Sequence, residues 1–587
     1  MRSTFSGLNT MVRGVFANQL SLDTVGHNIT NASTEGYSRQ AVNQAATRAQ
    51  EVPSLYGGAL VGTGVDAMSI QRARNVYADK QYWAETSTHE YYKAAQVNYD
   101  KLEAIFDDSD KTGVKTAMDL FYRAWSDLST NASTDSNRVT VIEKGNILVD
   151  KMSTAASQLQ EQINAQYADI RVHLTTINDI NDQIVELNKN IMGAEAVGAS
   201  ANDLRDQRDL LVDKLSTYMN LNVYEDENGM YTIVSNGISM VNGINKLTLE
   251  MSDPYIIGDN DYGLNDYTIQ IKESGIAYIP QNGALKAELD TIAEDKGYID
   301  SLADMAAFMM TTFNAMHQQG AGIDGTDANI GQYPPVTGTY TGPTYGINFF
   351  GDDNTVYTWD ATNECVVATE YTSGSITRSL SNPTAITDTP GVQITGTVVA
   401  TGPVNLRGIN ILNAMRINTK LTEAGGTSLV AARKLTVEQD TNATGAYLTT
   451  YSVKADGTKD GTNAVNLSSL FNLAVDNVSS TATVSYNGTA VNMNSRSIHD
   501  VSLNAYYQSV MSQLGTDAAS VDNKESAQED LITQIVNWRS STSGVDWNEE
   551  LTNMITFQKG YSACSRCLTT MDEMLDRLIN STGVVGR

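Results

Sequence analysis

Several short patterns in this sequence combine residue types that could do chemistry. Cys564-Ser565-Arg566-Cys567 has the CxxC spacing of redox and zinc sites. No second CxxC and no nearby histidine accompany it, and Cys564 falls on the apolar face of an expected helix. We therefore expect Cys564 and Cys567 to pack rather than react, with a redox role left open.

A histidine near an expected helix end is the second candidate. His317 follows Asn314 by one turn and could act as a base or a metal ligand. No second ligand sits at helical spacing, so a satisfied histidine near a helix cap is the better interpretation. Gly57-Gly58 and Gly62-Thr63-Gly64 lack the Lys-Ser/Thr of a phosphate-binding loop and are typical of a hairpin.

Arginines and aspartates gather at 203–213. Arg205 and Asp209 are four residues apart and could form an ion pair along one helix, which favours a solvated helix face. None of these patterns assembles a catalytic group. The sequence thus predicts no catalytic residue, no metal site and no cofactor, and we do not expect an enzyme.

The composition excludes some classes of binding partner. The chain has 587 residues, 39 Lys+Arg and 68 Asp+Glu, giving a net charge of -29 that repels the nucleic-acid backbone. Three cysteines cannot all pair, so no disulfide framework is encoded. No apolar run approaches the roughly 20 residues needed to span a bilayer, and no cleaved signal is evident. We expect no nucleic-acid binding, no membrane insertion, and either a cytoplasmic protein or export without a cleaved signal.

Charge is unevenly distributed along the chain. Residues 1–50 hold four arginines against two acidic residues, and residues 541–587 hold four basic against six acidic residues. The two ends cancel, so residues 51–540 carry all of the -29. This pattern predicts packed ends and a solvated middle.

Both ends show helical periodicity with apolar residues three and four apart. In the first helix, Met11, Phe16, Leu20 and Val25 widen the apolar face. Each end of the chain thus carries a stripe of apolar residues along one helix face, here called a seam. The two seams imply that the helices pack on each other or on neighbouring copies. The residues expected to pack subunits are Phe5, Leu8, Val12, Val15, Leu22 and Ile29 near the N-terminus, and Met554, Phe557, Tyr561, Cys564, Leu568, Met571, Leu575 and Leu578 near the C-terminus.

A specific motif follows the first helix. Its Asn and Ser/Thr side chains can satisfy the groups of a helix end, Gly36 permits a turn, and Tyr37 can anchor that turn. The residues are Asn28, Asn31, Gly36, Tyr37, Ser38, Arg39 and Gln40. This motif resembles the signature of the bacterial flagellar axial proteins, and its Ser-Arg-Gln ending is similar to the hook-associated version at the junction of hook and filament. Glu35 stands where the family usually has Pro, so we expect a less rigid turn.

The resemblance extends along most of the chain. It includes Gly62-Thr63-Gly64-Val65, the Asn-Asp-Leu-Arg-Asp-Gln-Arg-Asp run at 202–209, the Asn314/His317/Gly320 helix end and the block from Gln528 to Leu575. It implies a structural subunit that self-associates into a ring, with hook protein below and a second junction protein or filament above. It also implies export through the flagellar type III pathway, an export chaperone at the C-terminal helix, and an extracellular place at the junction.

The middle of the chain predicts a rod and an inserted domain. Apolar positions keep helical phase from Ile147 to Ile191, which predicts a helix over about 141–192. Further helices are expected at 71–108, 112–130, 202–218, 291–318 and 502–540, with strands at 221–250 and a hairpin at 483–493. From about 325 to 480 the Thr/Gly/Asn-rich composition predicts an antiparallel β domain, with a helix-like stretch from Ile409 to Lys434.

The fold class expected is a multidomain α+β protein. The terminal helices form a coiled-coil domain (1–48 and 543–587), a helical-bundle rod follows (49–324 and 495–542), and a β-rich outer domain (325–494) is inserted. Two alternatives stay open. One is another flagellar axial protein such as hook, distal rod or flagellin. The other is an extracellular carbohydrate-binding or hydrolytic protein that uses the β domain.

Overall fold

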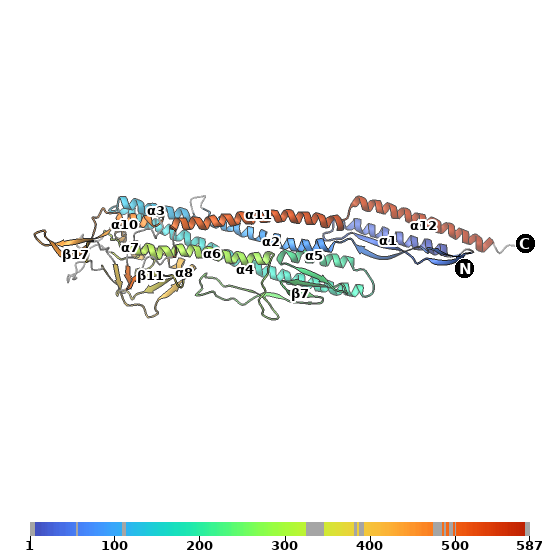
Figure 1. The fold of residues 1–587 in the computed structure, drawn as a ribbon, viewed down its shortest axis with the longest axis horizontal. Helices are drawn as coiled ribbons and strands as arrows, with labels where there is room; N and C mark the ends of the chain where they lie inside the picture. The colour runs from blue at the N-terminus through green and yellow to red at the C-terminus, as the bar shows by residue number, and fades with distance from the viewer. Residues whose placement is uncertain are drawn as a thin grey trace.

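The computed structural model describes residues 6–54, 57–107, 113–323, 345–380, 384–386, 392–472, 484–486, 489–491, 497–498 and 501–581. These residues form a long rod with both termini at one end (Figure 1). Helices run along the rod, and small β-sheets lie on its side and at the end away from the termini. The α+β fold class expected from the sequence is confirmed.

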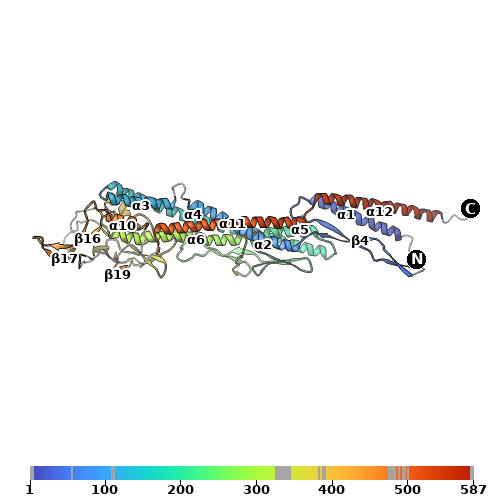
Figure 2. The ribbon, with the colours of Figure 1, turned by 45° about the horizontal axis from the view of Figure 1, so that its top comes forward.

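The end that holds the termini consists of two helices and a β arm. α1 (Ser6–Asn31) and α12 (Trp547–Ser581) lie side by side in both views (Figures 1 and 2). β1 (Gln40–Ala46) pairs antiparallel with β4 (Val65–Arg72), and β2 (Gln50–Ser54) pairs with β3 (Gly57–Val61). The glycine pairs at 57–58 and 62–64 thus belong to a hairpin, as predicted.

The rod is a bundle of long helices. Its longest member, α4 (Asp135–Glu195), has 61 residues and begins before the expected Val141. The apolar positions that keep helical phase in this helix are buried, which confirms the periodicity; they are Leu148, Met152, Ala155, Leu159, Ile163, Tyr167, Ile170, Leu174, Ile177, Ile184 and Ile191. The helices packed around it are α2 (Val76–Ile105), α3 (Val114–Thr130), α5 (Asn202–Tyr218), α6 (Ala284–Phe308) and α11 (Leu503–Ser543).

Side-chain caps fix several helix ends. Asn75 accepts hydrogen bonds from the backbone N–H groups of Tyr77 and Ala78 before α2, and Ser502 accepts one from Ala505 before α11. Asp546 accepts from the N–H groups of Asn548 and Glu549 at the start of α12. The break at 544–546 therefore separates α11 from α12.

The helix expected at 291–318 differs from the prediction. It begins earlier, at Ala284, and a π-helical turn (Met309–Phe313) separates α6 from α7 (Asn314–Gln318). Within this turn the Thr311 hydroxyl donates to the Ala307 carbonyl, and the Asn314 amide donates to the Met310 carbonyl. These side-chain bonds accompany the π-helical turn, where the regular backbone ladder is interrupted.

Small sheets flank α4 as the strand signals at 221–250 predicted. β5 (Asn222–Glu225), β6 (Tyr231–Ser235), β7 (Ile238–Asn242) and β8 (Asn245–Lys246) form a sheet in that order, with the first turn at Asn228-Gly229. β9 (Leu249–Met251) pairs with β10 (Ile269–Ile271).

The far end of the rod carries the strands of the expected outer domain. They are β11 (Thr355–Asp360), β12 (Cys365–Glu370), β13 (Thr377–Leu380), β14 (Val392–Thr395), β15 (Val404–Leu406), β16 (Leu435–Thr441), β17 (Tyr447–Ala455), β18 (Val484–Tyr486) and β19 (Thr489–Val491). β18 and β19 pair as the predicted hairpin, whereas β14 and β18 are parallel, so the expectation of a wholly antiparallel domain was wrong.

The helix-like stretch from Ile409 to Lys434 is also corrected. It contains α8 (Ile409–Ala414), α9 (Thr419–Thr422) and a 3₁₀ turn (Gly426–Leu429) rather than one helix. Asn418 caps α9, and Gly425 lies in the left-handed region before the 3₁₀ turn, so each segment ends after about one turn. A separate helix, α10 (Thr462–Ser469), follows.

One core joins this end to the rod. Phe121 of α3 contacts Phe313, Phe349 and Phe350, and Trp125 contacts Phe313 and Phe349, with ring centroids 5.4 to 5.8 Å apart. The buried cluster continues from the rod helices into residues 409–471. The boundary drawn at 325 thus separates segments that share a core, and the domain boundaries stay a prediction.

His317 lies in this core and is satisfied, as predicted. Its Nδ1 is 2.8 Å from the Ile347 carbonyl, and its Nε2 accepts a hydrogen bond of 3.0 Å from the Ala431 N–H. The side chain is fully buried, and burial lowers the pKa of His317 to about 4. A neutral imidazole therefore links α7 to two loops and supports structure.

Candidate assembly site at the terminal helices

α1 and α12 approach each other through glycines. A methyl group built on Gly14 would stand 3.0 Å from the Cys564 sulfur, and one on Gly7 would stand 2.1 Å from the Met571 side chain. On the other helix, a methyl group on Gly560 would stand 2.4 Å from the Asn18 side chain. A larger residue at any of these positions would require the facing side chain to move, so the glycines favour a close approach of the two helices. Cys564 lies against α1 at this contact.

The predicted packing residues of α12 divide into two groups. Met554, Phe557, Cys564, Leu568, Met571 and Leu575 are half-buried, and Cys564 and Met571 among them face α1. Tyr561 and Leu578 are exposed, at 38% and 54%. Cys567 is also exposed, and all three cysteines are free thiols.

The predicted seam of α1 is not its most buried face. Leu8, Val12, Val15, Leu22 and Ile29 are half-buried, and Phe5 lies outside the described residues. The buried positions of α1 are instead Gly14, Ala17, Ser21, Thr24, Val25 and Asn28. Small and polar side chains pack inside the chain because α12 and the β arm come close, and the larger apolar side chains lie toward the rim of that contact.

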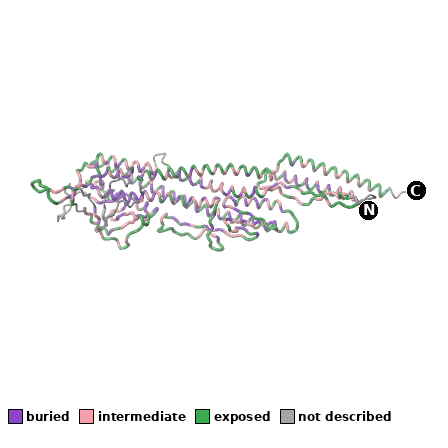
Figure 3. The backbone as a smooth tube through the Cα atoms, in the orientation of Figure 1, coloured by how far each residue is buried: buried purple, intermediate pink, exposed green. Residues whose placement is uncertain are grey.

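Large apolar side chains are therefore exposed on the terminal pair. Phe16 is 66% exposed on α1, and Trp547, Leu551 and Ile555 are 52%, 45% and 52% exposed on α12. Figure 3 shows exposed backbone along most of α12, whereas buried positions gather in the rod. The nearly neutral ends are thus not buried within one chain, contrary to the simplest interpretation of the charge pattern. An exposed apolar surface of this kind marks an interaction site.

The family motif forms the base of the terminal pair. Gly36 adopts a φ of +78°, which a residue with a side chain rarely takes, and the chain turns there. The Tyr37 hydroxyl donates a hydrogen bond of 2.8 Å to Asn28 Oδ1 and lies 3.0 Å from His27 Nδ1. Burial, together with nearby Asp203, raises the pKa of Tyr37, so the hydroxyl keeps its proton. Gly36 and Tyr37 thus act in the turn as predicted.

Asn28 and Arg39 join the two ends of the chain. The Asn28 amide donates to the Gln40 carbonyl at 2.9 Å and to Glu550 of α12 at 3.2 Å. Arg39 binds Glu549 through both terminal nitrogens at 2.8 and 2.9 Å, and its Nε lies 3.1 Å from Glu550. Glu550 is buried, so its charge needs these partners. Asn31 has a local role, because its amide donates to the His27 carbonyl.

The same motif is attached to α5 of the rod. The Ser38 N–H donates a hydrogen bond of 2.9 Å to Asp206, and the Gln40 side-chain amide donates one of 2.8 Å to Asp203. Asn202 returns a bond to Gln40 and another to the Ile70 carbonyl. Ser38 and Gln40 therefore connect the terminal pair to the helix that carries the Asn-Asp-Leu-Arg-Asp-Gln-Arg-Asp run.

A buried ionic cluster lies behind this connection. Arg72 contacts Asp206 at 2.7 Å and Asp209 at 2.8 Å, and Arg74 contacts Asp209 at 3.1 Å and Asp79 at 2.8 Å. Burial alone would raise the pKa of Asp209, but Arg74 and Arg72 hold it below the ordinary value. The cluster therefore stays charged and binds β4 to α2 and α5.

Arg539 brings α11 into the same cluster. Its Nε lies 3.0 Å from Asp79, and its terminal nitrogen donates 2.9 Å to Asp213. Trp83 also donates to Asp213, at 2.6 Å. Three parts of the chain that are distant in sequence, residues 72–83, α5 and α11, thus meet at one joint, which sets how the terminal pair continues from the rod.

The prediction for residues 203–213 was therefore wrong. Arg205 binds Glu195 at 2.6 Å and also Glu225, rather than Asp209, and Asp206, Arg208 and Asp209 are buried. Helix spacing describes neighbours on one helix and cannot reveal partners on other elements. The alternation of Arg72 and Arg74 in an extended segment was the signal that could have suggested a buried partner.

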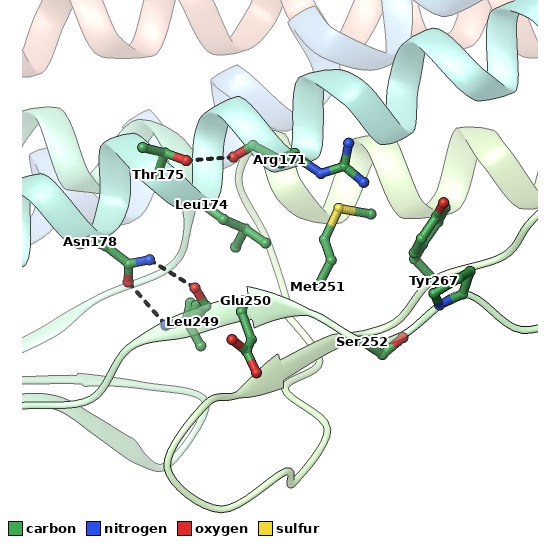
Figure 4. Close-up of a pocket in the computed structure, with 10 residues that line it drawn as sticks. Arg171, Leu174, Thr175, Asn178, Leu249, Glu250, Met251, Ser252 and Tyr267 are labelled. Carbon is green, nitrogen blue, oxygen red and sulfur yellow. Dashed lines mark hydrogen bonds between the residues drawn. The ribbon is translucent and has the colours of Figure 1, made fainter.

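Other features of the described residues give no second site. A pocket of about 430 Å³ lies between α4 and β9, and Figure 4 shows Asn178 bonded to the backbone of Leu249 at its edge. Arg171 and Glu250 are its charged lining residues. Within the described ranges, no three His, Cys, Asp or Glu side chains are grouped to hold a metal, and no helix is long and apolar enough to cross a bilayer.

Comparison with known families agrees with the motif. Residues 99–332 match the model described as flagellar hook-associated protein FlgK helical domain. Residues 539–581 match the model described as flagellar basal body rod FlgEFG protein C-terminal, which covers the end of α11 and the whole of α12.

Full-length relatives extend this match over the whole chain. Flagellar hook-associated protein 1 of Bacillus subtilis is 26% identical and covers 100% of both chains. The protein of the same name from Escherichia coli is 25% identical over 98% of this chain and 99% of its own length. A solved structure described as the flagellar hook junction protein FlgK from Burkholderia pseudomallei matches 79% of this chain with a TM-score of 0.54 at 17% identity, which supports the fold.

The long helices, the paired termini and the matched C-terminal segment define an axial structural protein of the bacterial flagellum. More narrowly, the chain belongs to the family of flagellar hook-associated protein 1. It is therefore a structural protein at the hook–filament junction, outside the cell, and not an enzyme. This decides against hook, rod, flagellin and a carbohydrate-active protein as identities.

Proposed function

We propose that this chain is an adaptor whose terminal helices pack copies of the chain into a ring. Hook protein lies below this ring, and a second junction protein or the filament lies above it. In the ring, α1 and α12 form the inner layer of a tube, the helical rod forms the next layer, and the segments from 345 to 491 face outward.

The exposed apolar residues of the terminal pair carry this proposal. Phe16, Trp547, Leu551 and Ile555 are each between 45% and 66% exposed although the two helices are already paired. Burial of apolar surface contributes roughly 25 cal/mol per Å², so several large side chains covered at every subunit contact stabilise an assembly substantially. The half-buried seam residues, from Leu8 to Ile29 and from Met554 to Leu575, lie beside them and extend the surface.

The charge distribution supports the orientation. The ends of the chain are nearly neutral, so the inner layer can bring many copies together without strong repulsion. All of the net charge of -29 lies between residues 51 and 540, which places the acidic surface on the rod and on the outer segments. An acidic exterior keeps the outer surface hydrated.

The proposal includes export through the flagellar type III pathway, with a chaperone at the C-terminal helix. α12 is suited to this role because it is mostly exposed: among its residues that the structure describes, Glu550 alone is buried. Before assembly the helix therefore presents an apolar surface that a chaperone can cover. The three free cysteines are compatible with a chain that travels unfolded.

The surface is tested by a pair of substitutions in cells. Phe16→Glu combined with Ile555→Glu places charge on exposed apolar positions of both helices and leaves the α1–α12 contact intact. Gln19→Glu is the matched control, since Gln19 is exposed and polar on the same helix. We expect the double variant to be exported but to leave hooks without filaments, whereas the control supports normal filaments. Filaments of normal number on hooks with the double variant would contradict the proposal.

A further inference from the structure

The centre of the rod contains a carboxylate with neutral partners. Asp295 of α6 is fully buried. Its Oδ1 accepts a hydrogen bond of 3.0 Å from the Asn98 amide on α2, and its Oδ2 accepts bonds of 3.1 Å from the Gln162 and Gln166 amides on α4. All of these donors are uncharged, so the carboxylate has lost its hydration without gaining a cation.

The groups around this cluster are acidic or neutral. Glu294 and Tyr298 on α6, Tyr99 on α2 and Asp517 on α11 are the titratable neighbours. α4 faces the cluster with its two glutamines. Glu294 repels a negative charge on Asp295, and burial is the larger effect; together they raise the pKa of Asp295 to about 7.

The amides can accommodate a protonated Asp295. Gln166 Oε1 is buried and has no hydrogen-bond donor among the described residues. Its Nε2 lies 3.1 Å from Asp295 Oδ2 and also donates to Asn98 Oδ1 at 2.5 Å. Turning the Gln166 amide over lets Oε1 accept the O–H of a neutral Asp295 in exchange for the bond to Asn98.

Another carboxylate along α6 shares the pattern. Asp304 accepts a bond of 2.9 Å from the Tyr506 hydroxyl of α11, and burial raises its pKa to about 6. Asp300 accepts a bond of 3.0 Å from the Tyr262 hydroxyl, but it is exposed. Asp295 is the most buried of the three, so its protonation has the largest effect on packing.

We propose that Asp295, held between Asn98, Gln162 and Gln166, makes the rod sensitive to pH, because uptake of one proton by this cluster strengthens the packing of α2, α4 and α6. The family places the chain outside the cell, where the surrounding medium sets the pH that the rod experiences.

The direction follows from linkage. In the unfolded chain Asp295 has a pKa of about 4, so between about pH 4 and about pH 7 the folded rod binds a proton that the unfolded chain does not. The contribution of this proton to stability is full below about pH 4 and is lost as the pH rises through about 7. At most, binding this proton changes the folding equilibrium constant by about a thousandfold.

The test compares full-length wild type with Asp295→Asn by urea unfolding of the helical signal at about pH 5 and about pH 8. Asparagine keeps the shape and cannot ionise. We divide the folding equilibrium constant of the wild type by that of the variant. This ratio should fall at least about tenfold from about pH 5 to about pH 8. Comparing the two chains removes the pH dependence of all other groups. Asp290→Asn, on the same helix but beside Lys286, is the control and should leave the ratio unchanged.

A second measurement does not depend on how well the variant folds. Infrared difference spectra of the wild type in D₂O between about pH 5 and about pH 8 should show loss of the carbonyl band of a buried protonated carboxyl, and Asp295→Asn should lack that component. Parallel unfolding curves, or a wild-type spectrum without such a band, would overturn the proposal.

Discussion

The Asn28 amide donates a hydrogen bond of 3.2 Å to the Glu550 carboxylate, 522 positions later in the chain. The same side chain accepts from the Tyr37 hydroxyl and from the Gln40 N–H at 2.8 and 2.9 Å. One asparagine therefore closes the turn after α1 and connects that turn to α12. The two ends of the polypeptide become a single structural unit at this point.

Removing this side chain should loosen the terminal pair and leave the rod unaffected. Asn28→Ala leaves the buried Glu550 with Arg39 alone and leaves the Tyr37 hydroxyl with His27 alone, which we expect to cost about 2–4 kcal/mol. Hydrogen exchange should accelerate in residues 6–40 and 547–581. Asn31→Ala is the control, with a cost of about 0.5–1 kcal/mol, because its amide makes a local bond to His27. Equal exchange in both variants would show that the connection to Glu550 is unimportant.

Breaking the ionic cluster should destabilise the joint. Asp209→Ala removes the shared partner of Arg72 and Arg74 and leaves two buried cations, at a cost of about 3–5 kcal/mol in urea unfolding at neutral pH. Glu195→Ala, which removes a partly exposed partner of Arg205, should cost about 1 kcal/mol or less. Similar losses for both would argue against a special role for the buried cluster.

The acid stability of the joint has a definite direction. Because the pKa of Asp209 is held below its ordinary value, this group stabilises the fold above about pH 4, and its contribution is lost as the pH falls through the lower pKa of the folded state. Acid unfolding of wild type should therefore be steeper than that of Asp209→Asn below about pH 4. A variant curve parallel to the wild type would exclude this linkage.

His317 should make the opposite contribution to that of Asp295. Its pKa is lowered to about 4 by burial, whereas the unfolded value is about 6.5, so its contribution is full above about pH 6.5 and is lost as the pH falls toward 4. His317→Gln should weaken this dependence and cost about 1–3 kcal/mol at neutral pH, because the bonds to Ile347 and Ala431 are imperfectly replaced. Stability measured against pH for both chains tests the sign.

Periodicity was sufficient to predict the helices. The positions of α4 from Leu148 to Ile177 repeat every three or four residues, Ile184 and Ile191 follow at intervals of seven, and each is buried as expected. α5 also begins and ends at the expected residues, 202 and 218. Long helices impose their geometry on the sequence over many turns, so single irregular residues do not obscure the pattern.

The joint could not be predicted in the same way. Asp209 and Arg205 are at ideal spacing on one helix, but Asp209 binds Arg72 and Arg74 across a gap of more than 130 residues. The seam of α1 likewise contained the right large apolar residues, whereas Gly14 and Ala17 proved to be the buried ones. The partner of a charged or buried side chain depends on which elements meet in space. Spacing along one helix cannot predict those contacts.

The most direct test of the adaptor model is electron microscopy of cells whose own copy of this chain is replaced by a version without residues 1–40. The deletion removes α1 and the motif up to Gln40, and with them the inner layer and the connection to Glu550. The model predicts hooks of normal length without filaments. Filaments attached to those hooks at the wild-type frequency would contradict it.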